Sequence, residues 1–184
     1  TVTGVQTCAL PILDISITDI NETPVWVNVQ VGSVLEGAAL GANVTLFGEP
    51  LTYSVDDDDA DVLTFAIVSV NGDTVDKDQF TLQDIPGENT FSLLSNVVFD
   101  YETLALYTVV VSASDAEFTV NSPDIEVAVT NQNDAPIINA STQDCFVSDG
   151  AAAGTTICQV VGVDEDSAAL LWGTLTYAFP AATT

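Results

Sequence analysis

An internal repeat organises most of the chain. Residues 13–24 read LDISITDINETP and residues 125–136 read IEVAVTNQNDAP, and the two segments align without a gap. Each is a run of alternating apolar residues that passes into an Asx-rich turn and closes on proline, a pattern typical of a strand followed by a linker. Pro24 and Pro136 lie 112 positions apart. The chain is therefore expected to fold as consecutive copies of one module of about 110 residues.

Further matches at the same period give the boundaries of the copies. Glu36-Gly37 aligns with Asp149-Gly150, and residues 63–66 (LTFA) recur as residues 175–178 (LTYA). These matches predict a complete repeat over residues 25–136. The last strand and linker of a preceding repeat (13–24) come before it, and a truncated copy (137–184) follows it. Residues 2–12, VTGVQTCALPI, resemble the translation of a common sequencing adapter, so residues 1–12 are predicted to be a non-native leader.

Short apolar runs predict the secondary structure of the complete repeat. Runs that alternate with period two between Asp, Gly, Asn and Pro turns indicate strands, and they cover residues 25–31, 51–55, 63–69, 107–113 and 125–130. The sequence shows no amphipathic helix longer than a turn or two, and its 47% of hydrophobic residues can supply a buried core. The predicted fold class is an all-β sandwich.

The charge balance excludes several classes of function. The chain has 27 acidic residues, Lys77 as its single basic residue and no histidine, for a net charge of −26. Nucleic acids and anionic lipids are bound through Lys and Arg, so neither is an expected partner. Without histidine, Ser-His and Cys-His catalysis and imidazole zinc sites are also excluded. Hard cations held by oxygen remain as expected ligands.

Paired carboxylates lie at the ends of predicted strands. The pairs are Asp57 with Asp59, Asp100 with Glu102, and Asp164 with Asp166. On an extended chain, residues i and i+2 point to the same side, so each pair places two negative charges together. A solvated acidic surface accounts for any one isolated pair, but the recurrence of a pair at matched repeat positions favours a divalent cation. Calcium tolerates such loose, many-oxygen geometry better than magnesium does.

The same residues form an ordered set of motifs that resembles the cadherin repeats. A Glu precedes a Gly-containing turn, a D-x-D motif follows, and an acidic motif comes before a long alternating strand that ends in Asp. Two linkers then resemble the cadherin linker in shortened form. In chain order, the motifs are Asp19-Ile-Asn-Glu-Thr-Pro24, Glu36, Asp57-x-Asp59, Phe99-Asp100-Tyr101-Glu102, Tyr107 with Val109, Val111, Ala113 and Asp115, and Asn131-Gln-Asn-Asp-Ala-Pro136. The resemblance covers residues 13 to about 179 and implies tandem Greek-key, immunoglobulin-like β-sandwich repeats, one complete and two partial.

The resemblance also implies calcium at two junctions between repeats. At the second junction, the implied ligands are Glu36, Asp100, Glu102, Asn131, Gln132 (through its backbone carbonyl), Asn133, Asp134, Asp164 and Asp166. At the first junction, they are Asp19, Asn21, Glu22, Asp57, Asp59 and Asp115. The pattern departs from the family at two of these positions, because Asn131 and Glu22 stand where Asp is usual. The loss of a charge at Asn131 predicts weaker calcium binding at the second junction.

The function implied by the resemblance is that of a calcium-dependent, extracellular adhesion or structural rod segment without enzymatic activity. Its expected partners are calcium ions and other cadherin-like repeats or cell-surface proteins, in homophilic or heterophilic contacts. The segment itself is expected to be soluble and the parent protein to be membrane-anchored or secreted. The alternative is a spacer or carbohydrate-recognition repeat of a large secreted bacterial adhesin or enzyme, which a catalytic or lectin domain in the parent gene would favour. Both linkers lack one Asn of the longer animal form, as bacterial and protist cadherin-like repeats do.

Two smaller hypotheses remain open from the residues alone. A carboxylate-pair hydrolase would need two carboxyls across a cleft, whereas the pairs here are expected at the ends of the module. Cys145 and Cys158 flank a turn and could form a disulfide between adjacent strands in an oxidising compartment, or remain as free thiols.

Overall fold

The computed structural model describes residues 14–75, 77–115, 117–138, 145–166 and 173–178. The predicted leader, residues 1–12, lies outside the described residues. The described part contains strands and no helix, and therefore no helix that could cross a membrane. The strands are β1 (Val25–Trp26), β2 (Gly32–Leu35), β3 (Thr45–Leu46), β4 (Glu49–Pro50), β5 (Thr52–Asp56), β6 (Thr64–Val70), β7 (Phe80–Ile85), β8 (Thr90–Ser95), β9 (Leu106–Ser114), β10 (Thr119–Asn121), β11 (Ile125–Thr130), β12 (Ile137–Ile138) and β13 (Gly162–Val163).

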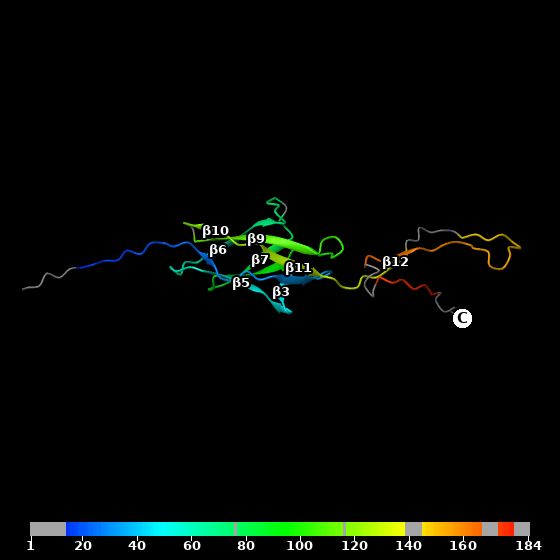
Figure 1. Ribbon diagram of the computed structural model, residues 1–184, viewed down its shortest axis with the longest axis horizontal. Helices are drawn as coiled ribbons and strands as arrows, with labels where there is room; N and C mark the ends of the chain where they lie inside the picture. The colour runs from blue at the N-terminus through cyan, green and yellow to red at the C-terminus, as the bar shows by residue number, and fades with distance from the viewer. Residues whose placement is uncertain (1–13, 76, 116, 139–144, 167–172, 179–184) are drawn as a thin grey trace, which may run out of the picture.

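Strands β1 to β11 form two facing sheets, which confirms the predicted all-β sandwich. One sheet has the order β1-β5-β8-β7, and the other contains β10, β9, β11, β2, β3 and β4, with β6 paired to β9. The sandwich occupies the middle of an elongated molecule, and the two linkers leave it at opposite ends (Figure 1). Any residue that sits at a linker is therefore also at one end of the sandwich.

The strand predictions held best where apolar residues alternate. Strands β5, β6, β9 and β11 lie within one residue of their predicted limits. The predicted strand 25–31 is wrong beyond Trp26, because the chain crosses there from one sheet to the other. The Val27 N–H donates to Ser54 O (3.1 Å), and Asn28 Oδ1 then accepts from Ser54 N (3.0 Å). The crossing delivers the chain to β2, in the opposite sheet.

Gly32 begins β2 at a point where the two sheets approach closely. A Cβ at this position would lie 2.2 Å from Val44 Cγ1 and 3.2 Å from Leu51 Cδ2. Val44 is fully buried, so it has little room to move away. The crossing therefore requires a residue without a side chain at position 32.

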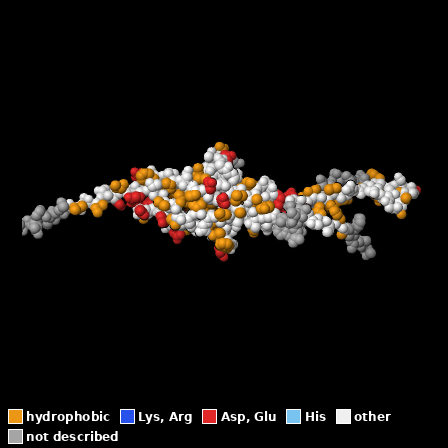
Figure 2. All heavy atoms as spheres, viewed as in Figure 1, with side chains coloured by type: hydrophobic (Ala, Val, Ile, Leu, Met, Phe, Trp, Pro, Cys, Tyr) orange, Lys and Arg blue, Asp and Glu red, His pale blue; other side chains and the backbone are white. Residues whose placement is uncertain are grey.

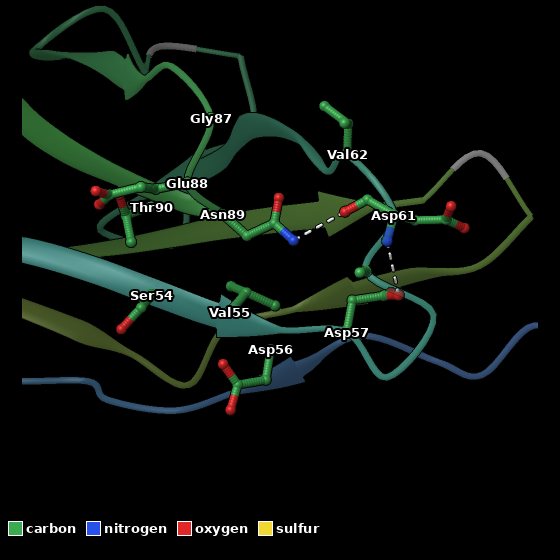
Figure 3. Close-up of a pocket in the computed structure, with 11 residues that line it drawn as sticks. Ser54, Val55, Asp56, Asp57, Asp61, Val62, Gly87, Glu88, Asn89 and Thr90 are labelled. Atoms are coloured by element: carbon green, nitrogen blue, oxygen red, sulfur yellow. Dashed lines mark hydrogen bonds between the residues drawn. The ribbon is translucent and has the colours of Figure 1, made fainter.

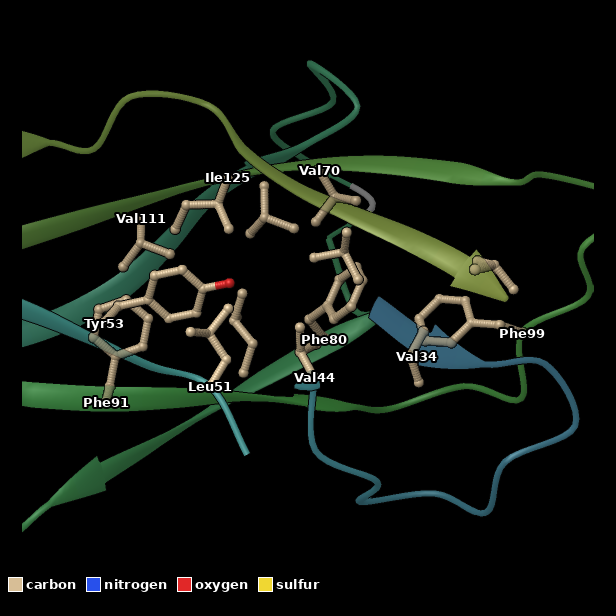
Figure 4. Close-up of a cluster of buried hydrophobic side chains, with 14 residues drawn as sticks. Val34, Val44, Leu51, Tyr53, Val70, Phe80, Phe91, Phe99, Val111 and Ile125 are labelled. Atoms are coloured by element: carbon tan, nitrogen blue, oxygen red, sulfur yellow. The ribbon is translucent and has the colours of Figure 1, made fainter. Parts of the chain in front are cut away.

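Phe91 lies at one end of the buried core, opposite the end that holds Phe99 (Figure 4). The Phe91 ring lies 5.4 Å from that of Tyr53 and 4.8 Å from that of Phe65, and the Trp26 ring meets it edge-on at 6.0 Å. Alternate residues of β9 and β11 point into the same core. These inward residues are Val109, Val111, Ala113, Ile125, Val127 and Val129. Because the core fixes both long strands, it also fixes the ends from which the linkers start.

The C-terminal part contributes a small separate sheet. β12 pairs antiparallel with β13 through Ile137↔Val163 and Ile138↔Gly162. Cys145 and Cys158 are joined by a disulfide, with their Cα atoms 5.7 Å apart. In the structure this pair is therefore a disulfide and not two free thiols.

Candidate metal centre

The turn after β2 places Glu36 at the end of the sandwich where the second linker begins. The Glu36 N–H donates to Thr130 O (3.1 Å), at the last residue of β11. The Gly37 N–H donates to Phe99 O (3.0 Å), and Gly37 has a φ of 65°, which favours glycine. The turn is thus tied both to the start of the linker and to the loop that carries Asp100 and Glu102.

Three carboxylates from separate segments meet at this end. Single oxygen atoms of Glu36, Glu102 and Asp134 all lie within 4.8 Å of one another. Beside them is a surface hollow of about 400 Å³ whose acidic lining comes from Glu36, Asp100, Asp134 and Glu165. The sequence patterns did not single out Glu165, because it lies between Asp164 and Asp166 and is not part of that pair.

Backbone hydrogen bonds orient the carboxylates. Glu36 is only 5% exposed, and its carboxylate accepts from the Tyr101 N–H (2.9 Å) and from the Gln132 N–H. The Asp100 carboxylate accepts from both the N–H and the hydroxyl of Thr103 (2.9 Å each), and these bonds lower the pKa of Asp100. Both carboxylates are therefore held in one orientation, and the bonds to Asp100 favour its charged form.

No cationic side chain compensates the cluster. Desolvation raises the pKa of Glu102, and the nearby charges of Glu36, Asp166 and Asp134 raise it further. Desolvation also raises the pKa of Asp134, and the charges of neighbouring carboxylates, Glu36 first, raise it further. Lys77, the single basic residue of the sequence, donates instead to Ile67 O (2.7 Å). Unrelieved repulsion of this kind favours a bound cation.

The linker and the segment after it complete this end. Asp134 N–H donates to Asp166 Oδ2 (2.9 Å), and Asp166 N–H donates to Asp164 Oδ1 (3.1 Å). Asp166 is only 4% exposed. Asn131 Nδ2 donates to Glu102 Oε1 (2.8 Å), while Asn133 Nδ2 donates to Asp134 O (3.0 Å). All the predicted residues of the second junction therefore lie on the segments that meet here.

Two buried oxygen atoms test whether a cation fits. Asn131 Oδ1 and Asp166 Oδ1 are buried and have no hydrogen-bond partner. Both atoms are acceptors, so only a donor or a cation could satisfy them. Burying an unsatisfied oxygen is costly, and neutral and charged oxygens together are the ligands that calcium prefers. The donor set at the second junction therefore fits calcium.

Gln132 makes contacts beyond the ligand role that was expected for it, and that role stays a prediction. The resemblance implied a ligand through its backbone carbonyl. Its N–H donates to Glu36 Oε1 and its side-chain Nε2 donates to Glu36 O. Sequence reasoning missed these contacts because they depend on how the linker folds back on the turn.

The first junction is assembled less completely. The Glu22 N–H donates to Asp59 Oδ2 (2.7 Å), and Asn21 Nδ2 donates to Asp115 Oδ2 (3.1 Å). Desolvation raises the pKa of Glu22, followed by the charges of Asp59, Asp19 and Asp58. Asp19 is exposed, and its connection to this junction is the charge that helps to raise the pKa of Glu22.

Asp57 is held inside the turn that carries Asp59. Its Oδ1 accepts from the N–H groups of Asp59 (3.1 Å) and Asp61 (3.2 Å), and its Oδ2 is buried without a hydrogen-bond partner. The turn borders a hollow of about 410 Å³ whose lining includes Asp57, Asp61 and Asn89 (Figure 3). Figure 2 shows acidic side chains gathered at both places where a linker meets the sandwich.

Comparison with known proteins places this geometry in context. No family model matches the chain. The chain is 29% identical over 161 residues to the protocadherin-like wing polarity protein stan of Drosophila melanogaster, a match that covers 83% of the chain and 4% of the relative. It is 29% identical over 163 residues to human protocadherin Fat 1, a match that covers 84% of the chain and 3% of that relative. The chain thus spans a small fraction of the curated relatives it matches.

Solved structures share the fold. The crystal structure of human protocadherin-24 EC1-2, form II, matches with a TM-score of 0.54 and 22% identity, over 81% of this chain and 63% of that one. Protocadherin gamma B2 extracellular cadherin domains 1–5 match with a TM-score of 0.53 and 20% identity, over 80% and 27% of the two chains. The β-sandwich predicted from the sequence therefore shares the fold of these cadherin ectodomain repeats, and the chain is similar in sequence to the two curated proteins named above.

Proposed function

We propose that this cadherin-like repeat is a calcium-dependent, non-enzymatic segment of an extracellular adhesion rod. Calcium held at the junctions would make successive sandwiches stiff relative to one another. The parent protein would be membrane-anchored or secreted, and its partners would be other cadherin-like repeats or cell-surface proteins, in homophilic or heterophilic contacts. The similarity to two protocadherins supports this setting for the chain.

The observation that carries the proposal is the meeting of Glu36, Glu102 and Asp134 within 4.8 Å. The three residues come from the turn after β2, from the loop before β9 and from the linker, so a bound ion would join all three. Asp166 adds a buried acceptor from the following copy. Through this arrangement, the orientation of two neighbouring repeats depends on a cation.

Two groups of residues would hold calcium, one group at each junction. Glu36, Asp100, Glu102, Asn131, Asn133, Asp134, Asp164 and Asp166 would supply oxygen at the second junction, with Gln132 beside them. Asp19, Asn21, Glu22, Asp57, Asp59 and Asp115 would supply it at the first. When bound, calcium supplies two positive charges that neutralise neighbouring carboxylates. The backbone N–H groups of Tyr101 and Gln132 keep Glu36 directed at the cluster.

Thermal unfolding with and without calcium tests the proposal. For one site, binding stabilises the folded state by RT ln(1 + [L]/Kd), about 1.4 kcal/mol when calcium is at ten times Kd. Extracellular calcium modules bind with Kd values of about 10⁻⁴–10⁻³ M, so millimolar calcium should raise Tm relative to chelator. Magnesium at the same ionic strength is the control. Superimposable melting curves in calcium and in chelator would refute the proposal.

The carbohydrate-recognition alternative has weaker support. The similar curated proteins are protocadherins, and the hollow at the second junction is lined mainly by acidic and linker residues rather than by an aromatic platform. A sugar-binding role would need a surface of different chemistry from the one at this junction.

A further inference from the structure

Hydrogen bonds from amide groups join the second linker to the sandwich. Asn131 Nδ2 donates to Glu102 Oε1 (2.8 Å), the Gln132 N–H donates to Glu36 Oε1, and Gln132 Nε2 donates to Glu36 O. We call these three bonds the amide clamp. They connect two consecutive linker residues to two separate segments of the repeat, the turn after β2 and the loop before β9.

The clamp is strong for a surface contact because two of its three acceptors are carboxylate oxygens. Hydrogen bonds to charged groups are shorter and stronger than neutral ones. Glu36 is also 5% exposed, so water competes little for its oxygens. Its second oxygen accepts from the Tyr101 N–H (2.9 Å), which means that the Glu36 carboxylate bridges the loop and the linker by itself.

The side chains at positions 131 and 132 are the kind that this contact requires. An amide is neutral and donates, so it binds a carboxylate without a counterion. A carboxylate at position 131 would have no donor to offer and would repel Glu102. Asn133, one residue beyond the clamp, instead donates to Asp134 O within the linker (3.0 Å). The bridging contact is therefore specific to Asn131 and Gln132.

We propose that the amide clamp docks the linker on the repeat independently of calcium. In this view, which rests on the proposed function of the junction, Asn131 and Gln132 are positioning residues. Calcium would then bind to a linker that is already in place and would add rigidity to an ordered junction. The dependence of the rod on calcium would be graded, because the linker retains part of its order when calcium is low.

Hydrogen exchange of single amides in excess chelator tests the clamp directly. NMR exchange rates are measured for the N–H groups of residues 131–134, with Val109 and Val127 as reference amides of the folded core. The test variant combines Asn131→Leu and Gln132→Met, which keep side-chain size but remove both side-chain donors. Gln83→Met is the matched control, because Gln83 is an exposed amide side chain on β7 and belongs neither to the clamp nor to a junction.

The clamp predicts that the wild-type Gln132 N–H is protected in chelator. In the double variant it should exchange about tenfold faster, while the control exchanges as wild type does and the core amides are unchanged. An unprotected Gln132 N–H in the wild type would overturn the clamp, as would equal rates in the double variant and the control. If the double variant loses core protection, the wild-type measurement in chelator decides.

Calcium titration of the same samples separates the two proposals. A linker that is protected in chelator and does not respond to calcium supports the clamp and refutes the proposed function. A linker that becomes protected only when calcium is added refutes the clamp and leaves the proposed function intact.

Discussion

Glu102→Gln should weaken calcium binding without weakening the calcium-free fold. Glu102 belongs to the cluster within 4.8 Å, and glutamine keeps its size and an oxygen that can still accept from Asn131 Nδ2. The matched control is Glu117→Gln. Glu117 is exposed and lies beyond Asp115, whose Oδ1 accepts from the Glu117 N–H (2.8 Å). Both variants lower the net negative charge by one, so a diffuse electrostatic field would give them equal losses of calcium affinity.

The size of the effect follows from Coulomb's law. Two unit charges about 4 Å apart interact by about 1 kcal/mol in water, so a divalent ion and a carboxylate interact by about 2 kcal/mol. Losing this attraction raises Kd about 30-fold. At a calcium concentration ten times the wild-type Kd, the stabilisation should fall from about 1.4 to about 0.2 kcal/mol. The Tm in calcium should therefore drop by about 4–6 °C.

In chelator, Glu102→Gln is expected to keep or raise the stability of the fold instead of lowering it. Glu102→Gln removes the repulsion between Glu102 and its neighbours Glu36, Asp166 and Asp134, which raises the pKa of Glu102 after desolvation does. The variant should then be at least as stable as wild type. Isothermal titration calorimetry gives Kd, and melting curves in calcium and chelator give the two stabilities. Equal losses of affinity in Glu102→Gln and Glu117→Gln would show that the acidity acts only as a diffuse field.

Three further predictions concern the second junction, the core and the dependence of stability on pH. Asn131→Asp should tighten calcium binding at the second junction, because it adds a charged ligand; calorimetry that shows equal or weaker binding would contradict the placement of Asn131. Phe91→Ala should destabilise the repeat by about 3–5 kcal/mol in urea unfolding, because Phe91 is fully buried among Tyr53, Phe65 and Trp26, and a loss below about 1 kcal/mol would contradict this core. Without calcium, Glu102 and Asp134 have raised pKa values in the folded state, so the folded state should gain stability as the pH falls from these values toward the ordinary carboxylate pKa. Asp100 and Asp115 have lowered pKa values, so stability should be lost as the pH falls below the ordinary carboxylate pKa. Urea unfolding at a series of pH values should therefore show a maximum of stability, and a stability that falls steadily from neutral pH would contradict this prediction.

The sequence predicted best the strands whose alternation matches a half-buried surface. β9 and β11 alternate inward and outward residues along their length, and period two marks such strands clearly. β8 was missed because three consecutive residues, Phe91 to Leu93, are all buried, which hides the alternation. The crossing after Trp26 was missed as well, because its cause is the fit of Gly32 against Val44 and Leu51, residues remote in sequence.

At the candidate site, the sequence predicted which residues meet but not all of their contacts. Spacing and the family resemblance were enough to single out Glu36, Glu102 and Asp134, which the structure brings together. Neither could predict that Gln132 donates to Glu36 or that Asn131 directs its amide nitrogen at Glu102. Those contacts depend on the path of the linker in space, and local sequence carries little information about that path.

The parallel pairing of β2 and β11 determines how the repeat would respond to a pulling force. Their register runs from Val127↔Gly32 to Thr130↔Leu35, and the second linker follows β11 directly. Tension along the molecule would draw β2 toward its N-terminal end and β11 toward its C-terminal end, so the two strands would slide past each other. All the ladder bonds between them would then bear load together, instead of breaking one after another as in a peeled hairpin. β1 pairs with β5 only through Val25↔Asp56 and Trp26↔Val55, so it would detach first and lengthen the tether while the sandwich stays closed.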